Sequence, residues 1–279
     1  MNVVEYSVEP LLRVAQAFGV IPRVMAELGR LMREPNSDLG EITVHLKRDS
    51  ALAGRLLRVA NSAAFAQSGR VGTVEQASAL IGYAEIHRLV GAMAVDQFSQ
   101  SSYPLYGFPG WRLRKNALFV ALLMEVLAGE SDVAPSVAYT VGLFRCFGRL
   151  ALEKVAAEMD PAEGFRADYD HDLVLWEKHT FGITGNDATA VILRHWQFPR
   201  NVGDAIAAHY AARNREPLAQ LLHLAAGMAD DLDHGLPGEK RYWGNVDEAY
   251  RQCGLNPADR PTHIDRTMTA FARMNRAIE

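Results

Sequence analysis

Alternating carboxylates between residues 168 and 172 have the spacing of a possible metal site. Asp168, Asp170 and Asp172 are separated by single residues, as at the start of a calcium-binding loop. However, Leu173 stands where such a loop needs glycine for its sharp turn, and His179 stands where it needs a bidentate glutamate. We therefore interpret these carboxylates as helix-start charges that complement the helix dipole.

A second acidic group lies further along the chain. Asp230, Asp231 and Asp233 precede His234 at the point where a predicted helix runs into a loop. Charged side chains at such a boundary are usually hydrated. We predict a solvated turn here.

Three cations next to an aromatic residue form the third candidate. Trp111 is followed by Arg112, Arg114 and Lys115 at a predicted helix start, where positive charge is unfavourable. These side chains could contact a ligand or partner, for example by gripping the phosphates of a nucleotide or nucleic acid. A helix entry against the preceding linker explains them more simply, and the formal net charge of −4 makes a nucleic-acid partner the less favoured one.

Most enzyme signatures are absent. The chain has no Gly-x-Gly-x-x-Gly or Gly-Lys-Ser/Thr phosphate loop, no Gly-x-Ser-x-Gly elbow and no His-x-x-x-His pair for zinc. Its two cysteines, Cys146 and Cys253, form no disulfide framework and fit a reducing compartment. With no signal-peptide pattern and no apolar run long enough for a bilayer, we expect a cytoplasmic protein without a membrane partner.

The elements that must position these residues have helical periodicity throughout, which predicts an all-α chain of two packed helical units. Residues 20–98 predict five helices, and the breaker-rich stretch 99–110 is the best candidate for an internal boundary. No strand-like alternation with a hairpin turn is visible. Further helices are predicted at Trp111–Ala128, Ser136–Glu158, Asp172–Thr180, Asp187–Trp196, Arg200–Ala212 and Pro217–Leu232.

Helix caps in the first unit can be assigned from residue types. Ser50 can cap one helix, Thr73 and Gln76 form a capping box for the next, and Gly82 would close that helix. Asp38 with Glu41 similarly opens an earlier helix.

The tail predicts a Gly/Pro-rich link followed by two short helices, Val246–Cys253 and Thr262–Ala277. We expect the apolar stripe of the last helix to pack on the bundle rather than to bind a partner. The stripe consists of Ile264, Met268, Phe271, Met274 and Ile278.

Four short motifs in the first unit resemble the signature of the HDOD family, the HD-related output domain of bacterial signalling proteins. They are Asp49-Ser50-Ala51-Leu52, Leu56-Leu57 with Asn61-Ser62, Thr73 with Ala77, and Ile81-Gly82. Serine replaces the usual proline of the first motif, and isoleucine replaces the leucine of the last.

The resemblance implies that residues 111–230 form a degenerate version of the HD-type metal-binding bundle. HD phosphohydrolases hold one or two metals that supply hydroxide for attack on phosphorus. At the corresponding positions this chain has Arg145-Cys146 for the His-Asp doublet, and arginine cannot ligate a cation. The other metal positions are similar to Asn116 (with Lys115 as the next register), Gly185, His209-Tyr210 and Ala226, so that one histidine remains.

The resemblance therefore implies a non-catalytic signalling module without a metal or other cofactor. It covers residues 18–230, divided into 18–100 and 111–230, with 235–279 as a C-terminal extension. We expect a stand-alone bacterial protein that binds a signalling protein or small ligand, and such domains accompany cyclic di-GMP and two-component systems. The alternatives are a metal-dependent HD-type phosphohydrolase and a nucleic-acid-binding regulator.

Three residues of this framework have both a binding and a structural interpretation. Asn61 and Ser62 could contact a ligand, but asparagine at a helix end readily bonds local backbone, so we favour a structural role. Arg145 is predicted to fill the former metal pocket by pairing with a buried carboxylate. The scattered arginines of the first unit are interpreted as solvated or paired with nearby acids: Arg55, Arg58, Arg70 and Arg88.

Overall fold

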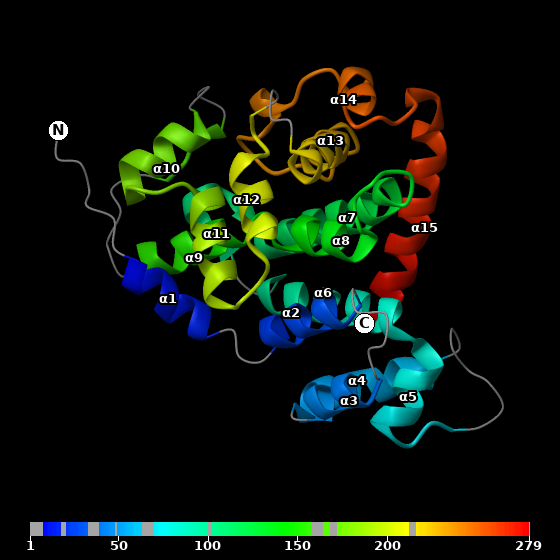
Figure 1. Ribbon diagram of the computed structural model, residues 1–279. Helices are drawn as coiled ribbons and strands as arrows, with labels where there is room; N and C mark the ends of the chain where they lie inside the picture. Colours follow the sequence, from blue (N-terminus) through cyan, green and yellow to red (C-terminus); the bar gives the residue numbers. More distant parts are fainter. Residues whose placement is uncertain are drawn as a thin grey trace.

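Helices form nearly every element of the computed structural model, which confirms the all-α prediction (Figure 1). The structure describes residues 8–17, 21–32, 39–47, 49–62, 70–99, 102–157, 164–167, 172–211 and 216–278. The helices of the first half are α1 (Val8–Gln16), α2 (Ile21–Leu31), α3 (Leu39–Lys47), α4 (Ser50–Ala60), α5 (Val74–Ile81) and α6 (Tyr83–Ser99). Those of the second half are α7 (Gly110–Ala128), α8 (Pro135–Phe144), α9 (Phe147–Ala156), α10 (Leu173–Phe181), α11 (Gly185–His195), α12 (Arg200–Ala208), α13 (Pro217–Asp231), α14 (Val246–Gln252) and α15 (Arg260–Ile278).

The helices α7 and α8 lie at the centre of the molecule (Figure 1). Every residue of α8 from Ser136 to Phe144 is buried, as expected of a helix that is apolar on all sides. The close approach of the two helices depends on Gly142, because a Cβ there would lie 2.7 Å from the Cα of Ala121. Around this pair pack α6, α12, α13 and α15.

The caps of the first unit follow the predicted residue types with one correction. Ser50 is not the cap of α4; Asp49 is, and its carboxylate accepts hydrogen bonds from the N–H groups of Ala51 and Leu52 at 2.9 and 3.0 Å. A carboxylate one residue earlier reaches both free N–H groups, which leaves Ser50 inside the helix. The capping box of Thr73 and Gln76 is confirmed, and so is the helix end at Gly82, which has a φ of +80°. Asp38 lies outside the described residues, as do Asp168 and Asp170.

The predicted linker between the units is an ordered small hairpin. Strands β1 (Ser102–Tyr103) and β2 (Phe108–Pro109) pair antiparallel around the 3₁₀ turn η1 (Pro104–Tyr106). The prediction that no hairpin occurs was therefore wrong, because strands this short leave no alternating pattern in the sequence. Tyr103, Tyr106 and Phe108 are buried, so this stretch is part of the core.

Helices from both ends of the chain pack on the rest of the bundle. In α1, Leu11, Val14 and Ala15 are buried against α9 and α11, and the Trp196 indole N–H donates to the Ala15 carbonyl at 3.2 Å. The last helix, α15, stands at the right edge of the view in Figure 1 and packs against α7, and it also contacts α6 and α4. Its predicted stripe does pack on the bundle through Met274, but Met268 is 45% exposed and does not belong to the buried face.

Across the described part of the chain, no helix has both the length and the apolar character needed to cross a bilayer.

Candidate functional site

The doublet Arg145-Cys146 lies in a break between two helices. The sequence predicts one helix from 136 to 158, but α8 ends at Phe144 and α9 begins at Phe147. Cys146 adopts φ −102° and ψ 10°, which ends the helical hydrogen-bond ladder and turns the chain. The break places the Arg145 side chain in the interior, where it is fully buried.

Arg145 pairs there with Glu239, which comes from the loop before the 3₁₀ turn η3 (Lys240–Tyr242). Its Nη2 donates to Oε2 of Glu239 at 2.7 Å, and its Nη1 donates to Oε1 at 3.1 Å. The Nε and Nη2 groups also donate to Oδ1 of Asn116, at 3.2 and 2.8 Å. The buried carboxylate that Arg145 was predicted to require is therefore present, and both side chains of the pair are 0% exposed.

A second arginine, Arg149 in α9, extends this ion pair into a network. Arg149 donates from Nη2 to Oε1 of Glu239 at 2.6 Å and to the Tyr210 hydroxyl at 2.6 Å. Tyr210 in turn donates to the same Oε1 at 2.8 Å. On its other side Arg149 faces Glu177, with Nε 3.9 Å from Oε1. Two arginines and two glutamates thus balance their charges in the interior.

The pKa values follow from this pairing. Burial by itself raises the pKa of Glu239, but the positive charges of Arg145 and Arg149 outweigh it and hold the pKa at about 2. Burial raises the pKa of Cys146 to about 11 against the opposing effect of Arg145, so its thiol is not an activated nucleophile. Burial also raises the pKa of Glu177, against the opposing charge of Arg149. The two arginines hold Glu239 as a fixed negative charge.

The single retained histidine, His209, is neutral. Burial, and secondarily the charge of Arg145, lowers its pKa to about 3. Its Nδ1–H donates to the Ile206 carbonyl at 2.7 Å, which leaves Nε2 as an acceptor 3.5 Å from Nη1 of Arg145. Protonation would place a second cation against that guanidinium.

Acidification is therefore expected to destabilise the protein from about pH 6.5 downward. The unfolded chain takes up a proton at His209 near its ordinary pKa of 6.5, whereas the folded chain does so only near pKa 3, so stability falls as the pH falls through this window. This one group should cost roughly 2 kcal/mol by pH 5. Urea denaturation at pH 7, above this window, and at pH 5 measures the loss of stability. His209→Gln should remove that part of the slope, while substitution of the exposed His195 should not; equal slopes in all three proteins would contradict the assignment.

The residues at this site do not fit a metal ion. Among the described residues, no group of three or more histidine, cysteine, aspartate or glutamate side chains is arranged to hold one. The carboxylate of Glu239 is already bound by two guanidinium groups, which are permanently charged and would repel a cation.

The structure brings together five of the seven predicted degenerate positions: Asn116, Arg145, Cys146, His209 and Tyr210. Gly185 joins indirectly, since its N–H donates to Oε2 of Glu177 at 2.7 Å. Ala226 is buried in α13 and offers no polar side-chain atom.

The predicted contacts of the first unit are engaged within the chain. The Asn61 amide donates to the carbonyls of Leu57 and Val71 at 2.8 and 2.9 Å and accepts from the Val71 N–H. This confirms its structural role at the end of α4, directly before Ser62. Arg88 is paired with Glu85 at 2.6 Å, as the paired interpretation of these arginines requires.

The basic cluster at the start of α7 is partly engaged as well. Arg112 donates to the Gly235 carbonyl at 3.0 Å, and Arg114 lies 3.2 Å from a carboxylate oxygen of Asp96. Trp111 remains 59% exposed. A role of these residues and of Lys115 in ligand or partner contact stays a prediction.

The residues of the two acidic stretches have different structural roles. Asp172 caps α10 by accepting from the Leu175 N–H at 3.1 Å, as predicted for a helix-start charge. Asp231 and Asp233 are exposed, in agreement with a solvated turn. That prediction was wrong for His234, which is buried with its ring stacked on Phe119 at a centroid distance of 3.9 Å.

Sequence reasoning did not identify Glu239, Arg149 or Glu177. Glu239 lies in what reads as a Gly/Pro-rich link, and neither its spacing nor its neighbours mark it as buried. The one available signal was Arg145 itself, because a buried guanidinium requires an anion. That requirement does not indicate which of the acidic residues supplies it.

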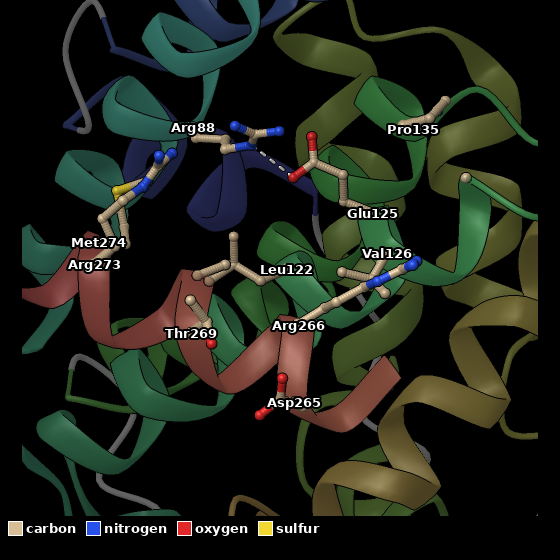
Figure 2. Close-up of a pocket in the computed structure, with 12 residues that line it drawn as sticks. Arg88, Leu122, Glu125, Val126, Pro135, Asp265, Arg266, Thr269, Arg273 and Met274 are labelled. Atoms are coloured by element: carbon tan, nitrogen blue, oxygen red, sulfur yellow. Dashed lines mark hydrogen bonds and ion pairs between the residues drawn. The ribbon is translucent and has the colours of Figure 1, made fainter. Parts of the chain in front are cut away.

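A separate groove of about 700 Å³ lies between α7 and α15. Its floor includes Leu122 and Met274, with Leu122 near the middle (Figure 2). Arg88 and Arg273 line one end, but both are paired with Glu85 at 2.6 Å. The volume suits a small molecule, whereas the paired charges do not specify a ligand class.

The fold and the charge network define an all-α protein with the HD-like helical architecture and a buried salt-bridge network around Arg145 and Glu239. The model of the HDOD domain matches residues 19–212, and the chain therefore belongs to the HDOD domain family. Comparison with curated proteins gives no match.

Solved structures share this fold at low sequence identity. A protein from Marinobacter aquaeolei VT8, named for signal transduction, superposes with a TM-score of 0.68 at 20% identity over 91% of this chain. The match spans only 58% of that longer protein. A protein from Shewanella amazonensis SB2B, named as a phosphohydrolase, gives 0.63 at 22% identity over 97% of this chain and 98% of its own. An HDOD domain protein of unknown function from Geobacter sulfurreducens gives 0.64 at 17% identity over 98% of both chains.

Proposed function

We propose that this chain is a non-catalytic HDOD signalling module that acts by binding a protein partner or a small ligand. Membership of the HDOD family and a neighbour named for signal transduction support the signalling part of this proposal. A cytoplasmic bacterial setting and a link to cyclic di-GMP or two-component signalling follow from the family resemblance. The division into 18–100, 111–230 and the extension 235–279 belongs to the same proposal.

The observation that carries the proposal is the salt bridge between Arg145 and Glu239. An HD-type hydrolase needs a divalent ion to make hydroxide available near neutral pH. Here a guanidinium stands at the aligned doublet position, and the nearest carboxylate is neutralised by two arginines. Neither a cation nor a nucleophilic water has a place in such a network.

The alternative of a metal-dependent phosphohydrolase draws on the names of two structural neighbours. Their identities to this chain, 22% and 16%, support a common fold alone. A nucleic-acid-binding function would require the cluster at Arg112, Arg114 and Lys115. Salt-dependent DNA binding that is lost on their replacement would support it.

Metal removal is the test. The purified protein is expected to contain less than stoichiometric Mn, Fe, Zn, Ni and Mg by elemental analysis, and EDTA should leave its melting temperature unchanged. On the same samples, no turnover of cyclic dinucleotides or of a generic phosphodiester is expected, with or without added Mn²⁺. Stoichiometric metal together with turnover would show that the chain is an enzyme.

A further inference from the structure

The segment that carries Glu239 is held to the rest of the protein by hydrogen bonds near both of its ends. We call residues 234–243 the strap. At its start, the Asn116 amide donates to the His234 carbonyl at 2.7 Å. Near its end, the Tyr242 hydroxyl donates to Asp172 at 2.8 Å, and its ring stacks on Tyr210 at a centroid distance of 4.3 Å. Glu239 lies between these attachments, so the strap inserts one carboxylate into the interior.

The receiving groups form a cradle, which we define as Arg145, Arg149 and Tyr210. The Arg145 fork donates one N–H to each oxygen of Glu239, a planar arrangement that matches a carboxylate. Arg149 and Tyr210 add two further donors to the same oxygen, Oε1. Four N–H or O–H hydrogen bonds thus converge on a single two-oxygen anion, and the Cys146 thiol lies 4.0 Å from Oε1 as a weaker donor.

The cradle retains donor capacity beyond Glu239. The Nη1 group of Arg149 is buried and has no hydrogen-bond partner among the described residues. Arg149 is 3% exposed, so this donor lies away from bulk solvent. Without Glu239, the two buried guanidiniums would keep one ion pair among the described residues, that of Arg149 Nε with Glu177 at 3.9 Å, and would hold excess positive charge.

We propose that the cradle is a carboxylate-binding site whose resident ligand is Glu239, and that a free small carboxylate occupies it when this side chain is removed. The assignment goes beyond the proposed signalling function and rests on it only in that no metal occupies the site. It predicts chemical rescue: acetate or formate should replace the missing carboxylate in Glu239→Ala.

The experiment measures thermal and urea unfolding of the full chain at pH 7 in sodium acetate, sodium formate or sodium chloride of equal ionic strength. Glu239→Ala should be less stable than the unmodified protein in chloride and should regain stability in acetate with saturation. At ten times the dissociation constant, the folding equilibrium constant should rise about tenfold. An unchanged Glu239→Ala response between acetate and chloride would overturn the proposal.

Two matched variants separate the cradle from general salt effects. Glu239→Gln keeps the cradle filled with a neutral side chain, so acetate should not stabilise it. Asp231→Ala removes a half-exposed carboxylate that pairs with Arg260 at 2.9 Å near the surface, so acetate should not stabilise it either. Equal responses of all variants to acetate would overturn the assignment.

Phosphate at the same ionic strength tests the ligand class. Stabilisation of Glu239→Ala by phosphate equal to or above that by acetate would overturn the carboxylate assignment, because the fork would then not select a planar anion. If Glu239→Ala is recovered only unfolded, refolding from urea gives the same answer. Recovery in acetate but not in chloride supports the proposal, and recovery in neither contradicts it.

Metal content measured on the same samples keeps this inference apart from the proposed function. Stoichiometric metal in the unmodified protein would contradict the proposed function, whatever acetate does to the variant. Metal-free protein without rescue would contradict the carboxylate site alone.

Discussion

Arg145→Ala is expected to lower the free energy of unfolding by about 3–5 kcal/mol. The substitution removes one partner of a fully buried ion pair and leaves the Asn116 Oδ1 atom without its two N–H donors. Glu239 would keep Arg149 and Tyr210, but a buried carboxylate that loses half of its cationic partners is more costly to hold in the interior. Urea denaturation at pH 7 measures the effect.

The control for this loss is Arg251→Ala, which removes an arginine of the same size from the exposed surface of α14. Surface substitutions of this kind usually change stability by less than about 0.5 kcal/mol. The double variant Arg145→Ala with Glu239→Ala should lose less stability than the sum of the single variants, since each single change strands the other charge. If Arg145→Ala loses no more stability than the control, Arg145 does not stabilise the protein through the buried charge network.

Gly142→Ala is expected to cost at least about 3 kcal/mol, the upper end for overpacking a core. A Cβ at this position would lie 2.7 Å from the Cα and 2.8 Å from the backbone N of Ala121. These atoms belong to the α7 backbone, so no side-chain rotation can relieve the contact and α7 and α8 must move apart. Thermal and urea unfolding report the loss.

Gly54→Ala is the matched control. Gly54 also lies inside a helix, α4, but a Cβ there would have no heavy atom within 4 Å outside its immediate neighbours. Alanine should therefore stabilise the protein by about 0.5–1 kcal/mol through helix propensity. Similar destabilisation of both variants would show that the close approach of α7 and α8 is not what requires glycine at 142.

The buried charge network surrounds His209, the one histidine kept among the predicted metal positions. Neutral His209 faces Arg145, and its low pKa keeps it uncharged over the physiological range. In the interior around it, the charges of Arg145 and Arg149 are paired with those of Glu239 and Glu177.

The sequence by itself determined the helical class, most helix positions and the family. These depend on local patterns: apolar residues at helical spacing, the capping box at Thr73 and Gln76, and the short motifs from Asp49 to Gly82. It also determined that Arg145 cannot ligate a metal, which follows from the chemistry of guanidinium alone.

Only the tertiary structure decided which carboxylate neutralises Arg145. Glu239 is 94 residues away in the chain, in a stretch without helical periodicity. It is buried where the strap meets Arg145 before α9, Arg149 within α9 and Tyr210 just after α12. The helix break at Cys146 and the hairpin at 102–109 were missed for the same reason. Long-range contacts override the local preferences of a few residues, and these contacts cannot be predicted from a periodic pattern in the sequence.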